Sequence, residues 1–288
     1  MALKLSSKSG EKKAGGVMSG LFSGMGIGRA FILIGLLFLL PVALLIYNAY
    51  QQSQSDLSAI AKEREGVKYL GPSRELWRQM TLHRGVFNPL LNNDPATVAK
   101  REPMRKKVEE QIASLTKTLT SKDQTLDLGE EIDNINKYWA ELKANIEKMD
   151  EPESFSAHNK LLDQIQTMTV TVADASTLTL DTSLDSYYLQ DTFVNRLPAV
   201  LTQVGLARRV AGEVAAKKTA SPEDKLTYTN LQRVLPLVNN TMFDGYKRAL
   251  ASNEKLSASI GGEVGLLNSS QKDVLDVLKT RLFETPKI

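Results

Sequence analysis

Residues 30–50 read AFILIGLLFLLPVALLIYNAY, an almost uninterrupted apolar run without a charged side chain. At a helical rise of about 1.5 Å per residue the run is roughly 31 Å long, close to the hydrocarbon thickness of a bilayer. The hydrophobic core of a signal peptide is shorter, about 7–15 residues, and a small-residue cleavage site follows it. Here residues 51–55 (QQSQS) lead directly into helix-like sequence. The run therefore predicts a transmembrane helix, and a cleaved secretory leader is the alternative.

The segment before this run is basic. Residues 1–29 contain five basic side chains and one acid, Glu11; the basic residues are Lys4, Lys8, Lys12, Lys13 and Arg29. Positively charged flanks of membrane helices stay in the cytoplasm. We therefore expect residues 1–29 to form a cytoplasmic tail and residues 51–288 to form a domain outside the inner membrane.

Charge and composition narrow the functions open to the exported domain. The net charge of +3 comes from the tail, and the rest of the chain is nearly balanced, so no nucleic-acid partner is expected. The chain has no cysteine and two histidines, His83 and His158, which leaves no zinc constellation at the usual spacing. Phosphate-binding, dinucleotide-binding and nucleophile-elbow motifs are absent from the sequence. We expect no enzymatic activity, metal or cofactor.

Apolar positions three and four residues apart predict helices through nearly the whole exported domain. Proline, glycine and capping residues divide it into about six. The expected helices run from the membrane to Phe87, then over residues 95–122, 127–149, 152–178 and 185–218, and finally from Pro222 to residue 282. The starts at Asp94-Pro95 and Ser221-Pro222-Glu223-Asp224 combine a capping side chain with proline in the first turn. The last segment reads as one long helix bent at Pro236 or near Gly261-Gly262.

The predicted fold class is all-α, with a transmembrane helix followed by an elongated antiparallel helical bundle. A domain of this length exceeds one ordinary four-helix bundle, and two stacked four-helix modules would accommodate it. Residues 51–288 hold no second apolar run of about 18 residues. This chain is therefore expected to be single-pass, either as part of a larger protein or as a protein with one anchor.

Two internal prolines mark where a ligand could bind. Pro72 and Pro198 each remove a helical hydrogen bond, and Pro198 frees the carbonyl of Val194. Gly66 and Gly71 beside Pro72 allow close approach of a neighbouring backbone or a small molecule. Arginines cluster near both prolines, and a guanidinium facing a groove suits a small carboxylate, although long arginine side chains also lie along outer surfaces. These arginines are Arg64, Arg74, Arg78 and Arg84 near the first proline, and Arg196, Arg208 and Arg209 near the second.

Aromatic side chains near these arginines are candidates for the walls of the groove or for core packing: Tyr69, Trp77, Tyr187 and Tyr188. The predicted ligand-binding set is Arg64, Tyr69, Arg74, Arg78, Arg84, Tyr188 and Arg196. His83 is expected to be a surface or polar-core residue of the bundle and not a ligand-binding residue.

The order of these parts resembles the sensory half of bacterial methyl-accepting chemotaxis proteins. Two local stretches add to the resemblance: KEREGVKYLGP at residues 62–72 followed by LHRG at 82–85, and LDTSLDSYYL at residues 180–189 followed by VNRLP at 194–198. In that family the first aspartate of the second stretch is commonly followed by proline, and Thr182 stands there instead. The length and the number of expected helices of residues 51–288 resemble those of the helical bimodular type of input domain.

The resemblance implies a homodimeric receptor of the bacterial inner membrane. Its periplasmic domain would bind an organic acid or amino acid between helices and pass a conformational signal to a cytoplasmic module. A second membrane helix, the linker after it and the methylated coiled coil of the family are not in this sequence. Two alternatives stay open: a membrane-anchored helical scaffold or partner-binding protein, and the input domain of a sensor kinase or a cyclic-dinucleotide enzyme.

Overall fold

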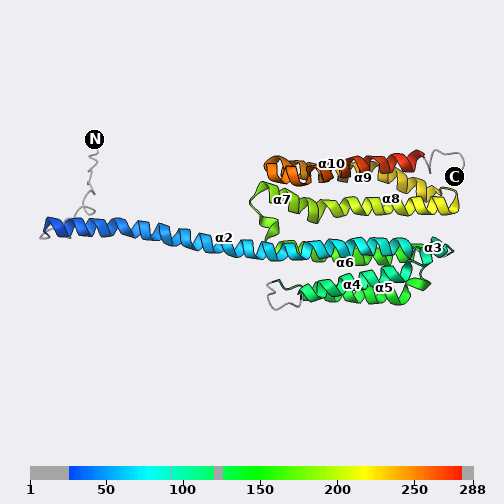
Figure 1. Cartoon of the computed structure of the whole chain (residues 1–288), viewed down its shortest axis with the longest axis horizontal. Coiled ribbons are helices and arrows are strands. Elements are labelled where there is room, and N and C mark those ends of the chain that lie inside the picture. The colour runs from blue at the N-terminus through cyan, green and yellow to red at the C-terminus, as the bar shows by residue number, and fades with distance from the viewer. Residues whose placement is uncertain (1–25, 92, 120–125, 281–288) are drawn as a thin grey trace, which may run out of the picture. The chain divides into compact units, whose positions relative to one another are not determined.

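The computed structural model describes residues 26–91, 93–119 and 126–280, and within these ranges the chain is helical and contains no β-strand (Figure 1). The predicted cytoplasmic tail up to residue 25, the predicted helix end at Lys122 and the last predicted turn to residue 282 lie outside them. The α-helices are α2 (Ile27–Val86), α3 (Pro95–Val98), α4 (Arg101–Leu119), α5 (Gly129–Asn145), α6 (Glu151–Ala175), α7 (Leu184–Asp191), α8 (Leu197–Lys217), α9 (Pro222–Ser252) and α10 (Glu254–Leu278). Short 3-10 turns η1 (Pro89–Leu91), η2 (Ile146–Lys148) and η3 (Leu178–Leu180) and a π-helical turn η4 (Thr192–Arg196) connect them. The all-α prediction is confirmed for the described residues.

Helix α2 carries the apolar run and continues beyond it through Pro72. It is 60 residues long, and among the described residues it is the one helix long and apolar enough to cross a membrane, judged by length and composition. Its large apolar side chains from Phe31 to Tyr50 are exposed, except for the half-buried Leu33. The chain divides into two compact units, residues 1–58 and residues 59–288, and the second unit contains the features described below.

Four helices of the second unit share one hydrophobic core: α2, α4, α5 and α6. Five apolar positions at three-four spacing are buried in this core: Ile132, Ile135, Trp139 and Leu142 of α5 and Ile146 of η2. Fully buried side chains of α2 and α6 complete the core, among them Tyr69, Leu76, Met80, Leu161 and Ile165. The three-four spacing of these positions places them on one stripe of each helix, which is why the helices pack together.

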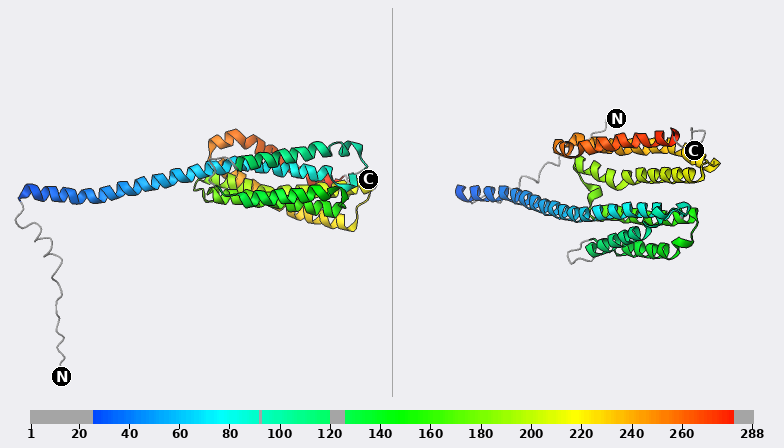
Figure 2. Two further views of the ribbon diagram at one scale, coloured as in Figure 1. Left: turned by 90° about the horizontal axis from the view of Figure 1, so that it is seen from below. Right: turned by 45° about the vertical axis from the view of Figure 1, so that its right-hand side comes forward.

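Helices α8, α9 and α10 lie side by side (Figures 1 and 2). Their side chains form smaller cores of their own. In one, Tyr228 and Leu231 from the start of α9 pack with Leu278 at the end of α10. The beginning of one helix thus meets the end of the next, so α9 and α10 form an antiparallel hairpin. Leu235, Met242 and Phe243 of α9 build the second small core against α8 and α10.

The long final helix predicted from Pro222 to residue 282 is wrong: the chain breaks at Asn253 and turns back. Asn253 has an extended backbone (φ −149°, ψ 106°), and its side chain accepts a hydrogen bond from the Leu256 amide, which starts α10. Its Nδ2 also donates to Asp185 at 2.6 Å. Neither Pro236 nor Gly261-Gly262 ends a helix, since Pro236 lies inside α9 and the glycines lie inside α10.

Most predicted helix starts are confirmed. Asp94 caps α3, and Ser221 caps α9 in a capping box that Asp224 closes from the third helical position. The helix expected over residues 95–122 is interrupted after Val98 and begins again at Arg101. The helix expected over residues 185–218 is likewise divided into α7, η4 and α8, so the count of about six was too low.

Pro198 explains the division at η4. Because proline has no amide hydrogen, the carbonyl of Val194 has no helical partner, and the chain widens into a π-helical turn in which the Leu197 amide bonds Thr192. The freed Val194 carbonyl accepts a hydrogen bond from Nε2 of Gln166 on α6 at 2.8 Å. The predicted effect of Pro198 on Val194 is therefore confirmed, and its consequence is a tether between α6 and η4.

Candidate ligand-binding site

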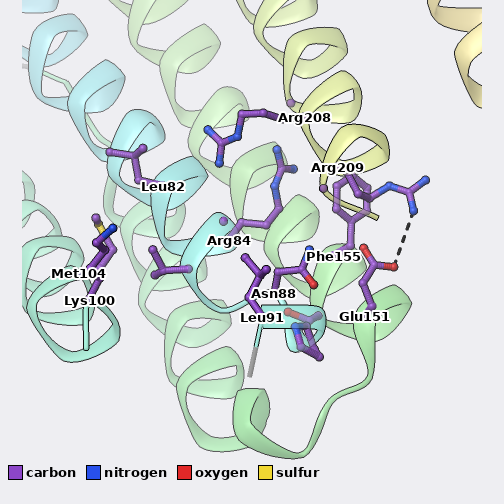
Figure 3. A pocket seen from close by; sticks show the side chains of 16 residues that line it. Leu82, Arg84, Asn88, Leu91, Lys100, Met104, Glu151, Phe155, Arg208 and Arg209 are labelled. Atoms are coloured by element: carbon purple, nitrogen blue, oxygen red, sulfur yellow. Dashed lines mark ion pairs between the residues drawn. The ribbon is translucent and has the colours of Figure 1, made fainter. Parts of the chain in front are cut away.

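A cavity of about 430 Å³ lies where the end of α2 and η1 meet α4, α6 and α8 (Figure 3). Four basic side chains line it against one acid: Arg84, Lys100, Arg208 and Arg209 against Glu151. Apolar side chains form much of the remaining wall: Leu82, Val86, Leu91, Met104 and Phe155. The cavity thus combines excess positive charge with an apolar surface, the usual composition of a site for an organic anion.

Arg84 enters the cavity from the last turns of α2. Its Nη1 donates to Oδ1 of Asn159, and its guanidinium carbon lies 4.7 Å from the ring centre of Phe155, both on α6. Burial, followed by the nearby positive charges of Arg208 and Arg209, lowers the pKa of Arg84 to about 10. The local environment therefore opposes the charge of Arg84 and would favour a negative group beside it.

Arg208 and Arg209 come from neighbouring positions of α8 but have different surroundings. Arg209 is held by Glu213 at 2.5 Å and by Glu151 at 3.7 Å, and its guanidinium also lies over Phe155. Burial, followed by the charge of Glu213, raises the pKa of Glu151. Neither Arg208 nor Arg84 forms an ion pair with a carboxylate of the described residues.

Two glycines allow the arginines to reach across the helix interface. A Cβ atom on Gly85 would overlap Nη2 of Arg208, and a Cβ atom on Gly205 would overlap Nη2 of Arg84. Each guanidinium therefore occupies space that the absence of a side chain on the other helix leaves free. Figure 3 shows Arg84 and Arg208 approaching each other from α2 and α8.

A buried histidine pair lies directly behind this cavity. Nδ1 of His83 and Nε2 of His158 are 2.9 Å apart, and Nδ1 of His158 is 2.6 Å from the carbonyl oxygen of Ser154, a residue of the cavity wall. Because a carbonyl only accepts, His158 carries its proton on Nδ1, and Nε2 accepts from His83. Nε2 of His83 is then an unprotonated, buried nitrogen without a partner.

Burial is the main reason why both histidines stay neutral. It lowers the pKa of His83 to about 2, with further contributions from His158, Arg105 and Arg101. It lowers the pKa of His158 to about 4, against the opposing hydrogen bond to Ser154. The expectation that His83 is a polar-core residue agrees with this position.

The structure separates the seven residues predicted to bind a ligand. Arg84 alone among them lines the cavity. Tyr69 is fully buried in the large core, and its hydroxyl donates to Glu65 at 3.3 Å. Tyr188 lies beside Tyr187, with the guanidinium of Arg248 over its ring. The ligand-binding role of the set stays a prediction, and these positions do not form one site.

The remaining arginines of the set have three different roles. Nη2 of Arg74 donates to the Phe193 carbonyl at 2.7 Å, and Arg196 donates to Asp191 and to the Thr241 carbonyl, so both hold the π-helical turn η4. Arg78 forms an exposed pair with Glu75, and Arg64 is exposed on α2. Gly66 does allow a close approach, to Ser176, whereas a Cβ on Gly71 would meet nothing within 4 Å.

Several cavity residues were missed or undervalued in the sequence. Arg208 and Arg209 were recognised as a cluster but not placed in the site, and Glu151, Phe155 and Lys100 were not considered. One sequence signal could have pointed to the two arginines, because each has a glycine close by on its own helix. Gly85 directly follows Arg84, and Gly205 lies one turn before Arg208. The other wall residues are brought together by packing and carry no local signal.

Comparison with known protein families, curated proteins and solved structures finds no match for this chain. Within the described ranges, no group of three or more histidine or acidic side chains is arranged to hold a metal ion. A function has to be inferred from the cavity, from its charges and from the apolar part of α2.

Proposed function

We propose that this chain is the ligand-sensing region of a transmembrane chemoreceptor. In this proposal residues 30–50 span the inner membrane of a bacterium and residues 51–288 lie in the periplasm as two stacked helical modules. The receptor is a homodimer that binds an organic acid or an amino acid between its helices. The resulting conformational signal passes through α2 to a cytoplasmic module.

The observation that carries the proposal is the unbalanced charge of the cavity. Arg84 and Arg208 bring two guanidinium groups from different helices to one space, and no carboxylate of the described residues pairs with either of them. A guanidinium in a partly dry site gains most from a planar oxyanion that accepts two hydrogen bonds. A carboxylate ligand would supply the missing negative charge.

Helix α2 supports the signalling part of the proposal. Arg84 lies two residues before Val86, the last residue of α2, and the same unbroken helix contains the apolar run. A ligand that contacts both α2 and α8 would bind with different free energies to two relative positions of these helices. Its binding would therefore favour one position, which is the requirement for a ligand-driven signal.

The two sets of cores support the stacked-module part. One core belongs to α2, α4, α5 and α6, and two belong to α8, α9 and α10, while a fourth, small core joins the end of α6 to η3 and η4. The cavity and the tethers from Arg74 and Gln166 lie where these groups meet. A ligand in this cavity would act on the contact between the groups.

Calorimetric titration of the full chain in lipid nanodiscs with organic acids and amino acids tests binding. We expect heat from at least one carboxylate, and a loss of affinity of about tenfold or more in Arg84→Gln, the effect of removing a charge-assisted hydrogen bond. Arg78→Gln is the matched control, because Arg78 lies on the same helix but outside the cavity. The absence of heat for every compound at millimolar concentration would contradict ligand sensing and favour the helical scaffold.

A distance measurement tests the signal. The natural chain has no cysteine, so Lys62→Cys with Lys247→Cys introduces the sole labelling sites, on α2 and α9. We expect the distance distribution between two spin labels to shift when the bound carboxylate is added. A ligand that binds with no change in this distribution would argue for a binding protein without signalling.

A further inference from the structure

The charges of the cavity also indicate how many negative charges its ligand carries. Of its four basic side chains, Arg209 is already neutralised by Glu213 and Glu151. Arg84 and Arg208 have no carboxylate partner, and each guanidinium lies over a glycine of the other helix, Gly205 and Gly85 respectively. Two neighbouring guanidinium groups without a carboxylate partner favour a ligand with more than one negative charge.

We propose that this cavity binds an amphiphilic dianion, with a doubly charged oxyanion head between Arg84 and Arg208 and an apolar body against Leu82 and Leu91. The inference rests on the proposed ligand-sensing function and names the chemical class of its ligand. A phosphate monoester and a dicarboxylate share this chemistry, because both present several oxygens and two charges to a guanidinium pair.

The charge of the head follows from the two arginines. A single carboxylate satisfies one guanidinium fork and leaves the second guanidinium without an acceptor. The charge of the exposed Arg208 then still repels that of the half-buried Arg84. A second negative charge removes this repulsion and gives each fork an acceptor. Lys100 on the cavity wall adds a further positive charge, which also favours a doubly negative ligand.

The apolar body follows from the wall and from the volume. Leu82 of α2 and Leu91 of η1 supply apolar wall, whereas the guanidinium groups of Arg84 and Arg209 cover the ring of Phe155 on α6. At about 430 Å³ the cavity falls in the range of sites that enclose a drug-sized ligand. An ion such as phosphate or succinate would leave most of this wall in contact with water.

The test compares ligands that differ in one property, by calorimetric titration of the full chain in nanodiscs at constant ionic strength. Phenyl phosphate and phenylsuccinate present a dianion with an aromatic body, benzoate presents one charge with a similar body, and inorganic phosphate and succinate present the head alone. We expect at least one aromatic dianion to bind about tenfold or more tightly than benzoate and than its own head group. Comparison of the affinities of phenyl phosphate and phenylsuccinate shows whether the cavity prefers a phosphate or a dicarboxylate head.

Arg208→Gln is the decisive variant, because Arg208 is exposed and forms no hydrogen bond or ion pair with the described residues, so its removal affects only the space over Gly85. We expect it to weaken the aromatic dianion by about tenfold and benzoate by less than about threefold. Arg78→Gln should leave both affinities unchanged. Equal affinities for benzoate and the dianions, or an Arg208→Gln protein that binds the dianion normally, would overturn the inference.

The outcomes separate this inference from the proposed function. A monocarboxylate that binds in an Arg84-dependent manner and shifts the label distance would keep ligand sensing and exclude the dianion. A dianion that binds as expected without shifting the distance would keep the dianion and exclude sensing. Absence of binding by every compound would exclude both.

Discussion

Arg84 and Arg208 each place a guanidinium over a glycine of the other's helix: Arg84 lies over Gly205 of α8, and Arg208 lies over Gly85 of α2. Each guanidinium can approach the opposite helix closely because the glycine that it faces has no side chain. The same approach brings two positive charges together, and burial with this mutual repulsion lowers the pKa of Arg84. A close packing arrangement has thus produced a site with an unbalanced charge.

Substitution of different glycines by alanine should change the free energy of unfolding by different amounts, depending on which atoms the new Cβ atom would meet. At Gly205 it would meet the far end of the long Arg84 side chain, so Gly205→Ala should change the free energy of unfolding by less than about 1 kcal/mol. At Gly66 it would overlap Oγ and Cβ of the buried Ser176, so Gly66→Ala should destabilise by about 1–3 kcal/mol. Urea unfolding of the full chain in detergent measures both.

Gly262 provides the control for this series. A Cβ there would meet nothing within 4 Å inside α10, so Gly262→Ala should stabilise by about 0.5–1 kcal/mol through helix propensity alone. If Gly66→Ala proved as stable as Gly262→Ala, the close contact between α2 and Ser176 would be wrong.

The His83–His158 pair predicts a loss of stability in acid. Both pKa values lie below the value of about 6.5 for an unfolded histidine, so the unfolded chain binds more protons than the folded chain below that pH. Stability is therefore complete above about pH 6.5 and falls as the pH decreases to about 4 for His158 and further for His83. The slope approaches about 1.4 kcal/mol per pH unit for each histidine.

Unfolding free energies measured between pH 7.5 and 4.5 check this expectation. The His83→Leu, His158→Met double variant should show a smaller slope over the same range, whatever its stability at pH 7.5. The slope is the informative quantity, because the charged neighbours Arg84, Arg101 and Arg105 are the same in both proteins. Identical slopes would show that the pair does not stay neutral in the fold.

The sequence predicts the local structure of this protein well, because local structure depends on local signals. Asp94 and Ser221 start helices through their side chains, and the three-four spacing in α5 identifies a buried face. Pro198 predicts the loss of a hydrogen bond at Val194, which the structure confirms. The break at Asn253 was missed, because the surrounding apolar spacing is continuous and the extended backbone is stabilised partly by Asp185, far away in the sequence.

The candidate site could be predicted in part only. Arg74, Arg78 and Arg84 look equivalent in the sequence, since each lies near an internal proline on one predicted helix. Tertiary packing separates them: Arg74 reaches η4, Arg78 stays in solvent, and Arg84 enters the cavity. Which arginine meets a carbonyl, a carboxylate or a cavity depends on the neighbouring helix, which local spacing does not specify.

Arg74 and Arg78 therefore make a matched pair on α2. Arg74→Met removes a charged hydrogen bond to the Phe193 carbonyl and the contact over the Phe193 ring, so it should destabilise by about 1.5–3 kcal/mol. Arg78→Met removes an exposed pair with Glu75 and should change stability by less than about 1 kcal/mol. Thermal and urea unfolding of the two variants measure the difference, and equal effects would contradict the tether to η4.

The proposed topology predicts which positions a membrane-impermeant maleimide reaches. The natural chain has no cysteine, so each variant carries a single reactive thiol. Lys247→Cys, at an exposed position of α9, should be labelled in intact spheroplasts, whereas Lys8→Cys should be labelled only after permeabilisation. The reverse pattern would place the helical domain in the cytoplasm and end the receptor proposal.

Gln166 and Pro198 should be energetically coupled, although one lies on α6 and the other on α8. In the natural protein the Val194 carbonyl has Gln166 as its partner because Pro198 has no amide hydrogen, so Gln166→Met should leave the buried carbonyl unpaired and destabilise by about 1–3 kcal/mol. In a Pro198→Ala background the new amide supplies a helical partner, and the same change should have less than half that effect. Oε1 of Gln166 is buried without a partner, but its removal contributes equally in both backgrounds and cancels in the double-mutant cycle. Additive effects within about 0.5 kcal/mol would mean that the carbonyl freed by Pro198 is satisfied in another way.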